Sequence, residues 1–201
     1  MKKQSVYSLF FVFALILGAN VFQQVGRAES AKPVEIGEVV SDFKAKDIGG
    51  NEHSLAALKG KNGTVLIFIS VQCPISNAYN ERMEKLAQDY AAKGVNVIGI
   101  NANSTESVAD VKQHASKHGF TFTIIKDDGN KIADQLGAEH TPEAYLLNAD
   151  GKLVYRGRID NQKNADIVSA SDLRDAIDET LAGQPVKKPV ALAFGCSIKR
   201  G

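Results

Sequence analysis

The chain has 201 residues, of which 44% are hydrophobic and 23% charged, with two cysteines and no tryptophan. This composition excludes a disordered chain, a collagen and a disulfide-dense miniprotein, and the length indicates one domain, with two as the outer limit. A chain this long buries a sizeable core without cross-links, so stability does not require the two cysteines.

The first 28 residues have the pattern of an export signal. Lys2 and Lys3 precede an apolar run that is densest over residues 9–17, and small residues lie three and one positions before a cut after Ala28. We therefore expect export to the periplasm or the extracellular space, with 1–28 removed as a signal peptide. The alternative is an uncleaved anchor that holds the protein on the membrane facing the periplasm, although the run is shorter than the roughly 20 residues that a span prefers.

The charge of the remaining chain argues against a nucleic-acid partner. Residues 1–28 carry three basic and no acidic residues, so their removal leaves 21 basic and 23 acidic residues and a net charge of −2. Such a surface has no basic footprint for a polyanion. Export also implies an oxidising compartment, in which a pair of cysteines can form a disulfide.

Strand-like and helix-like runs alternate over residues 34–182, which we predict to be one domain. The expected strands are 64–70, 96–101, 120–125, 144–148 and 153–157, the last two joined by an Asp150-Gly151 hairpin. The expected helices are 74–93, 108–118, 132–136 and a last helix that Ser169 or Ser171 caps and that runs to Leu181. This order predicts an α/β fold with a central mixed β-sheet flanked by helices, followed by an extended C-terminal tail over 183–201.

Cys73 is the first candidate for chemistry. It follows a strand buried on both faces and precedes a long helix, and Pro74 suits the first helical turn. The free N–H groups and positive dipole end of a helix favour thiolate over thiol, which lowers the pKa of a cysteine and makes it a nucleophile. The alternative is a buried cysteine that acts as a small hydrophobe.

Two further features of the sequence, Ser76 and the Thr141-Pro142 pair, bear on the chemistry of Cys73. Read as Cys-x-x-Cys, the motif has Ser76 in place of the second cysteine, and a serine cannot resolve a mixed disulfide. Ser76 either donates a hydrogen bond to the thiolate or simply solvates the first helical turn. Thr141 precedes Pro142 and is therefore extended. A cis Pro142 would be a backbone feature able to face the thiol, although a trans loop proline is the commoner outcome from residue type alone.

An ordered set of motifs supports a family resemblance from about Ile36 to the C-terminus. They are Asp42-Phe43, His53-Ser54-Leu55, Cys73-Pro74 with Tyr79 and Arg82, Ile98–Asn103, Thr141-Pro142-Glu143, Tyr155–Gln162 and the Gly195-Cys196 tail. Together they resemble the thioredoxin-fold redoxins, and among these the peroxiredoxin-like branch, also called the alkyl hydroperoxide reductase/thiol-specific antioxidant type. The resemblance implies a thioredoxin-like fold with a cis Pro142 facing Cys73, and Cys73 as the redox cysteine.

The sequence also departs from the patterns of this group. Peroxiredoxins have a proline seven residues before the peroxidatic cysteine, and here that position is Leu66, while Ser70 fills the hydroxyl position. The thioredoxin signature is incomplete too, because tryptophan is absent and Ser76 replaces a cysteine. The motif is therefore neither that of a standard peroxidase nor that of a standard dithiol reductase.

Cys196 lies 123 positions after Cys73, in the tail. It is a resolving cysteine that restores a two-thiol cycle, half of a static disulfide with Cys73, or a free or intermolecular thiol. A static bridge over a loop this long would contribute about 4.7 kcal/mol on the chain-entropy model. We favour a pair, catalytic or static, because an exported protein with two cysteines usually pairs them.

No motif calls for a metal or an organic cofactor, and we predict neither. His114 and His118 have the spacing of a zinc pair, but no carboxylate or cysteine flanks them at metal-site spacing, so a solvated helix face is the better interpretation. His140 is a candidate for tuning the thiol pKa, and Arg82 is interpreted as structural.

These observations predict a thiol–disulfide oxidoreductase or peroxiredoxin-like antioxidant protein that uses the Cys73 thiolate. Its site comprises Cys73, Cys196, Thr141, Pro142 and Ser76, and its partners are a protein disulfide or thiol, or a peroxide, together with an external electron donor. The alternative is a non-catalytic binding module in which a structural Cys73–Cys196 disulfide holds the fold.

Overall fold

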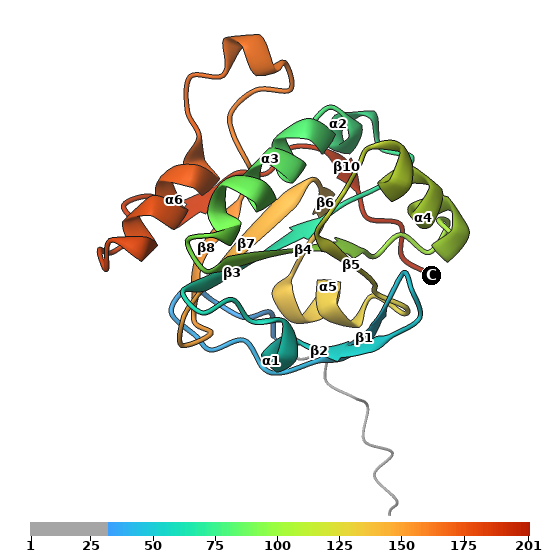
Figure 1. Ribbon diagram of the computed structural model, residues 1–201, viewed down its shortest axis with the longest axis horizontal. Helices are drawn as coiled ribbons and strands as arrows, with labels where there is room; N and C mark the ends of the chain where they lie inside the picture. Colours follow the sequence, from blue (N-terminus) through green and yellow to red (C-terminus); the bar gives the residue numbers. More distant parts are fainter. Residues whose placement is uncertain (1–31) are drawn as a thin grey trace, which may run out of the picture. The chain divides into compact units, whose positions relative to one another are not determined.

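The computed structural model describes residues 32–201, so the predicted signal peptide lies outside the described residues. Its centre is an eight-stranded mixed sheet in the order β2-β1-β5-β4-β3-β7-β8-β9 (Figure 1). The strands of this sheet are β1 (Lys44–Asp47), β2 (Glu52–Ser54), β3 (Gly63–Phe68), β4 (Val95–Asn101), β5 (Thr123–Lys126), β7 (Glu143–Asn148), β8 (Leu153–Gly157) and β9 (Val190–Ala191). The three strands β3, β4 and β5 are parallel, and β7 runs antiparallel to β3 and β8.

The central strand β3 is buried on both faces, as its unbroken apolar sequence predicts. Val65 and Ile67 belong to the apolar core on one face of the sheet, and Leu66 and Phe68 belong to the core on the other. Because side chains alternate along a strand, a strand covered on both sides must be apolar at every position.

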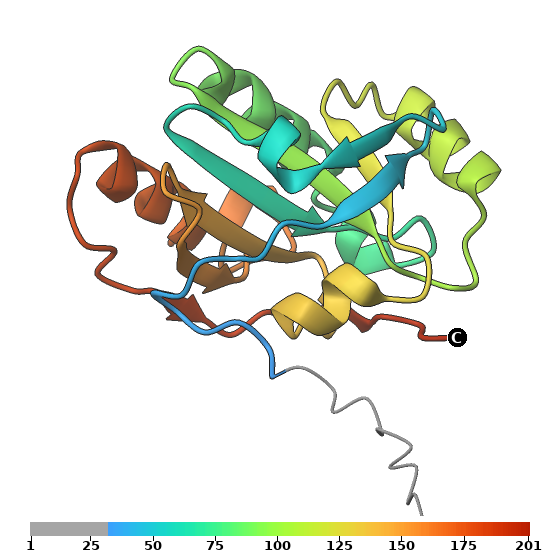
Figure 2. The same ribbon diagram turned by 90° about the horizontal axis from the view of Figure 1, so that it is seen from below.

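Helices cover both faces of the sheet. The core on one face contains residues of α3 (Asn80–Ala91), α4 (Val108–Lys117) and α6 (Asp172–Leu181). The core on the other face contains residues of α1 (Leu55–Leu58) and α5 (Lys131–Leu136), and Figure 2 shows α5 in yellow on that side. The predicted mixed sheet with flanking helices is therefore confirmed.

The helix expected over 74–93 is two helices, α2 (Pro74–Asn77) and α3. Between them the N–H groups of Ala78 and Tyr79 bond to the carbonyls three residues back, which is the tighter pattern of a 3₁₀ turn. The continuous-helix prediction was wrong at this point, since no glycine or proline marks the bend. The hairpin β1–β2 at the sheet edge was also not predicted.

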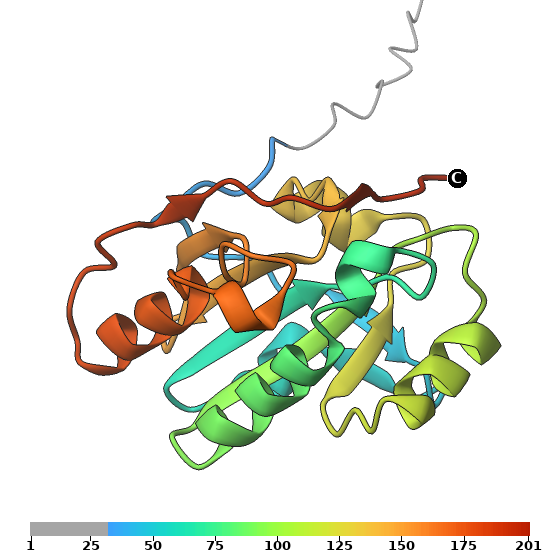
Figure 3. The same cartoon turned by 90° about the horizontal axis from the view of Figure 1, so that it is seen from above.

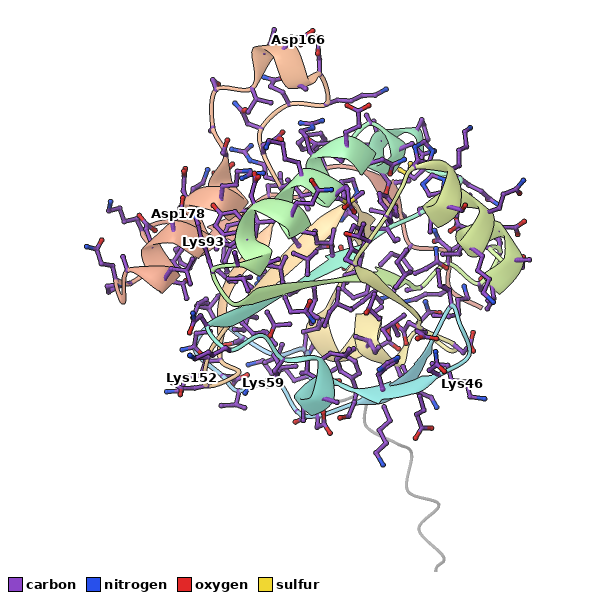
Figure 4. All side chains as sticks on the ribbon, viewed as in Figure 1. Lys46, Lys59, Lys93, Lys152, Asp166 and Asp178 are labelled. Atoms are coloured by element: carbon purple, nitrogen blue, oxygen red, sulfur yellow. The ribbon has the colours of Figure 1, made fainter. Side chains whose placement is uncertain are left out.

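The segment after α6 runs back along the domain as an extended chain (Figure 3). Its first part forms β9 beside β8, and its second part forms β10 (Cys196–Ser197), which pairs with β6 (His140–Thr141) in a separate two-stranded sheet. A loop over 161–170, which includes the 3₁₀ helix η1 (Ala165–Ile167), projects from the domain with Asp166 at its tip (Figure 4). Within residues 32–201, none of the helices has the length and apolar character needed to cross a membrane.

Candidate active site

Cys73 lies at the N-cap of α2, where the predicted strand-to-helix transition placed it. Its side chain is almost fully buried, at 2% exposed, and its Sγ accepts a hydrogen bond from the backbone N–H of Ser76 at 3.3 Å. Pro74 fills the first helical position. The sulfur therefore faces the unpaired N–H end of the helix, as the sequence predicted.

Thr141 and Pro142 lie directly across from this thiol. The Thr141–Pro142 peptide bond is cis, as the family resemblance implied, and Thr141 lies in the extended strand β6. The Cys73 thiol donates a hydrogen bond to the carbonyl oxygen of Thr141 at 3.2 Å. Residues 68 positions apart in the sequence thus form one site.

Cys196 also lies beside the backbone of Thr141. It is opposite Thr141 in the antiparallel pair of β10 and β6, and the Thr141 hydroxyl donates to the Cys196 carbonyl at 3.4 Å. Gly195 allows this approach, because a Cβ at that position would lie 2.1 Å from the carbonyl oxygen of Thr141. The two cysteines are therefore neighbours across the cis-proline turn, and both are free thiols.

The tail beyond Cys196 is tied to the domain by backbone hydrogen bonds. The Ile198 N–H donates to the Glu139 carbonyl at 2.9 Å, and the Lys199 carbonyl accepts from the Ser104 N–H at 2.8 Å. The side chain of Ile198 is buried in the core that contains α5. These contacts give Cys196 a defined place beside Cys73.

The two thiols influence each other's pKa in opposite directions. Burial raises the pKa of Cys73, but the thiol of Cys196 and the N–H of Ser76 stabilise its thiolate more, so the net pKa is below its usual value. Hydrogen bonding to Cys73, followed by burial, raises the pKa of Cys196. Cys73 is therefore the sulfur that loses its proton first.

Ser76 supports the site differently from either interpretation of its side chain. It is buried, and its hydroxyl accepts from the N–H of Ser70, which precedes the helix, at 3.1 Å instead of bonding the Cys73 sulfur or a group of the first helical turn. The Ser76 group that reaches Cys73 is its backbone N–H.

A buried carboxylate behind the turn 70–72 is a feature that the sequence analysis did not identify as part of the site. Glu106 is 2% exposed and accepts from the Ser70 hydroxyl at 2.6 Å, and from the N–H groups of Val71 and Gln72 at 3.0 Å each. Ser70 Oγ in turn accepts from the Cys73 N–H at 3.1 Å. The only signal in the sequence was a lone acidic residue in a cluster of capping residues after a buried strand.

The other predicted side chains lie outside this contact set. Arg82 pairs with Asp160 at 2.6 Å and so joins α3 to the segment after β8, which confirms its structural interpretation. His114 and His118 stack with ring centroids 4.4 Å apart, and both are half-buried. No group of three metal-ligating side chains occurs within residues 32–201. The backbone N–H of His140 donates to Glu143.

Comparison with known proteins places this site in a family. Residues 36–156 match the model of the AhpC/TSA family. The thiol-disulfide oxidoreductase ResA of Halalkalibacterium halodurans is 30% identical over 147 residues, which cover 73% of this chain and 81% of that protein. The chain therefore belongs to the AhpC/TSA family.

Solved structures agree on the architecture. A hypothetical protein of Sinorhizobium meliloti 1021 superposes with a TM-score of 0.78 at 32% identity, covering 85% of this chain and 97% of that one. The thioredoxin domain of a thiol-disulfide oxidoreductase of Bacteroides vulgatus superposes with a TM-score of 0.54 at 21% identity, covering 61% of this chain and 88% of that one. The fold is thioredoxin-like, as the sequence predicted.

Proposed function

We propose that the protein is a two-cysteine thiol–disulfide oxidoreductase in which Cys73 attacks and Cys196 resolves. The observation that carries this proposal is the position of Cys196 opposite Thr141, beside the thiol of Cys73. A second cysteine at this place can do what Ser76 cannot, because it reaches the same sulfur from β10 instead of from α2. The name of the ResA relative, a thiol-disulfide oxidoreductase, supports the same reaction class.

The two thiols are the reacting groups that this chain contributes to the cycle. The Cys73 thiolate attacks one sulfur of a partner's disulfide, which forms a mixed disulfide and releases the other sulfur as a thiolate. The Cys196 thiolate then attacks Cys73 Sγ, which forms the Cys73–Cys196 disulfide and releases the partner's second thiol. An external dithiol donor returns two electrons and two protons and regenerates both thiols.

Three further residues shape this proposed cycle. The Thr141 carbonyl accepts from the Cys73 thiol and so holds the sulfur before deprotonation. The peptide bond between Thr141 and Pro142 is cis, and proline brings no backbone N–H group to this place. Ser76 stabilises the thiolate through its backbone N–H.

We also propose that the reaction occurs outside the cytoplasm. The lysines and apolar run of residues 1–28 support export to the periplasm or the extracellular space, where a disulfide-bearing protein is an available partner. Retention of the leader would instead anchor the same domain, residues 34–182 with the tail 183–201, to the membrane surface.

The test uses the full chain with dithiothreitol as donor and insulin as disulfide substrate. We expect turnover by the unmodified protein, loss of turnover in Cys73→Ser, and a trapped mixed disulfide on Cys73 in Cys196→Ser, detected by mass spectrometry. Turnover that survives Cys73→Ser would overturn the proposal. Hydrogen peroxide in place of insulin tests the peroxidase reaction. The sequence argues against this reaction, because Leu66 occupies the position of the peroxiredoxin proline.

The alternative of a binding module with a locked disulfide makes a different prediction for the same pair. A structural disulfide has a reduction potential below about −300 mV, whereas a working pair has a higher one. Equilibration with glutathione buffers measures this potential. We expect a value above about −300 mV, and a lower one would favour the binding module.

A further inference from the structure

One short loop after β4 contacts both segments that carry the cysteines. Glu106, in this loop, holds the turn 70–72 that leads into Cys73. Three and two residues earlier, respectively, Asn103 and Ser104 bond to the backbone of Lys199, in the tail that carries Cys196. The two thiols therefore share one support although 123 residues separate them in the chain.

Among residues 32–201, Asn103 is the side chain that bonds to both halves of this support. Its amide nitrogen donates to Glu106 Oε1 at 3.1 Å, and its amide oxygen accepts from the Lys199 N–H at 2.7 Å. It is 4% exposed, so water does not replace these partners easily. An asparagine suits this place because one planar group offers a donor and an acceptor in opposite directions.

The rest of the network holds Asn103 and Glu106 in place. The Lys126 ammonium donates to the Asn103 carbonyl at 2.7 Å and to Asn101 Oδ1 at 2.8 Å. The Asn101 amide donates to Glu106 Oε2. The Glu106 carboxylate thus accepts from the turn 70–72 on one side and from Asn101 and Asn103 on the other.

We propose that Asn103 is a positioning residue that keeps Cys196 in register with Cys73 for the resolving step. The inference rests on the proposed two-cysteine cycle. Loss of the Asn103 side chain removes the partner of the Lys199 N–H on one side and one donor to Glu106 Oε1 on the other, so that only the Ser104 N–H still holds the Lys199 backbone to this loop. The tail then samples positions in which the Cys196 sulfur is out of reach of Cys73, and the intramolecular attack slows because its effective concentration falls.

The experiment follows the resolving step with dithionitrobenzoate as the disulfide. The Cys73 thiolate forms an adduct and releases one thionitrobenzoate, and the Cys196 thiolate then attacks the adduct and releases a second one. Mass spectrometry separates an internal disulfide, which carries no adduct, from a protein with an adduct on each cysteine. Stopped-flow absorbance gives the rate of each release.

We compare the unmodified chain with Asn103→Ala, and with Asn103→Ser in case the alanine variant folds poorly. The matched control is Asn96→Ala, because the Asn96 amide also bonds a backbone carbonyl, that of Leu58 at the end of α1 at 2.7 Å, but neither cysteine segment. We expect the second release to slow about tenfold in the Asn103 variants and to stay unchanged in the control, with the first release little affected. A loss of stability that affects the dithiol and disulfide forms equally does not change the ratio of the second release rate to the first.

The possible results separate the two proposals. Two releases with an internal disulfide in the unmodified chain, and an unchanged second release in both Asn103 variants, would overturn the positioning role and leave the two-cysteine cycle standing. An adduct on each cysteine of the unmodified chain, with no internal disulfide, would overturn the cycle and the positioning role together. A second release slowed equally in Asn96→Ala would also overturn the role of Asn103.

Discussion

At the residue scale, each of the two thiols changes the pKa of the other. The Cys196 thiol stabilises the Cys73 thiolate, and Cys73 in turn raises the pKa of Cys196. We therefore expect a titration with two separated steps, the first below and the second above the usual pKa of a cysteine, since the macroscopic values belong to the pair. Thiolate absorbance at 240 nm against pH measures both steps.

Single-cysteine variants assign the two steps. In Cys73→Ser the main cause of the raised Cys196 pKa is removed, so the remaining thiol should titrate at a lower pH than the second step of the unmodified protein. Two steps that both lie at the ordinary value would contradict the coupling.

Residue chemistry alone predicted half of this site. Cys73 could be identified because a cysteine between a buried strand and a helix has a local physical consequence, which needs no knowledge of distant contacts. Cys196 could only be suspected, since nothing near it in the sequence specifies that Gly195 will pass against Thr141. Glu106 and Asn103 could not be found either, because their hydrogen-bond partners belong to segments distant in the sequence. These segments are the turn 70–72 and the tail at Lys199.

At the element scale, the pairing of β10 with β6 depends on Gly195. A Cβ there would lie 2.1 Å from the carbonyl oxygen and 2.6 Å from the carbonyl carbon of Thr141. In Gly195→Ala the tail must therefore move away from the cis-proline turn, which should cost about 1–3 kcal/mol of stability and slow disulfide formation between the cysteines. Urea unfolding and quenched alkylation measure the two effects.

The control for this variant lies two residues further along the tail, in β10. Ser197 is exposed, so Ser197→Ala should leave both measurements within error of the unmodified protein. Equal disulfide-formation rates in Gly195→Ala and Ser197→Ala would show that the tail tolerates a side chain at the crossing.

Elements with a strong period were predicted well, and elements set by tertiary contacts were not. Tyr79, Met83, Leu86 and Tyr90 fall at helical spacing and are all buried against the sheet. The bend at Ala78 and Tyr79 escaped prediction because it falls inside this periodic pattern and no glycine or proline marks it. Similarly, β9 and β10 have two residues each, too few to show any period.

The link between α3 and the segment after β8 depends on a largely buried ion pair. Arg82 contacts Asp160 at 2.6 Å, lies over the Tyr79 ring, and donates to the carbonyls of Gln162 and Lys163. Removal of one partner leaves the other charge without its counter-charge, so Arg82→Ala should lower the free energy of unfolding by about 2–4 kcal/mol. Urea denaturation gives this value.

An exposed ion pair supplies the comparison. Lys93 and Asp178 lie side by side on the surface, 3.6 Å apart (Figure 4), and both are more than half exposed. Lys93→Ala should therefore cost less than about 1 kcal/mol. A loss in Arg82→Ala no larger than that in Lys93→Ala would mean that the buried pair does not hold the segment.

At the scale of the whole molecule, buried carboxylates form hydrogen bonds between separate segments of the chain and make stability depend on pH. Burial raises the pKa of Glu106 and Glu84, but hydrogen bonds from the groups around them outweigh burial, so both values lie below the ordinary one. Asp172 behaves in the same way, with Arg158 and Lys188 as its main partners. Asp127, at the start of α5, differs: burial dominates and its pKa is raised.

The sign of each contribution follows from proton linkage. A carboxyl whose folded pKa is lowered adds stability above its unfolded pKa, near 4.3 for glutamate, and this stability is lost as the pH falls through the folded value. A carboxyl whose folded pKa is raised acts oppositely, because the folded state binds its proton more tightly, and it favours folding at low pH.

We therefore expect the urea midpoint of the whole domain to stay constant near neutral pH and to fall as the pH drops below about 4.3. Glu106→Gln should flatten this acid fall, because the variant has no carboxyl to protonate at that place, although its midpoint is lower throughout. Asp127→Asn should steepen the fall, because it removes the one group of the four whose protonation favours the folded state. Urea midpoints measured from pH 3 to pH 7 test both slopes, and equal slopes in the two variants would contradict the assignment.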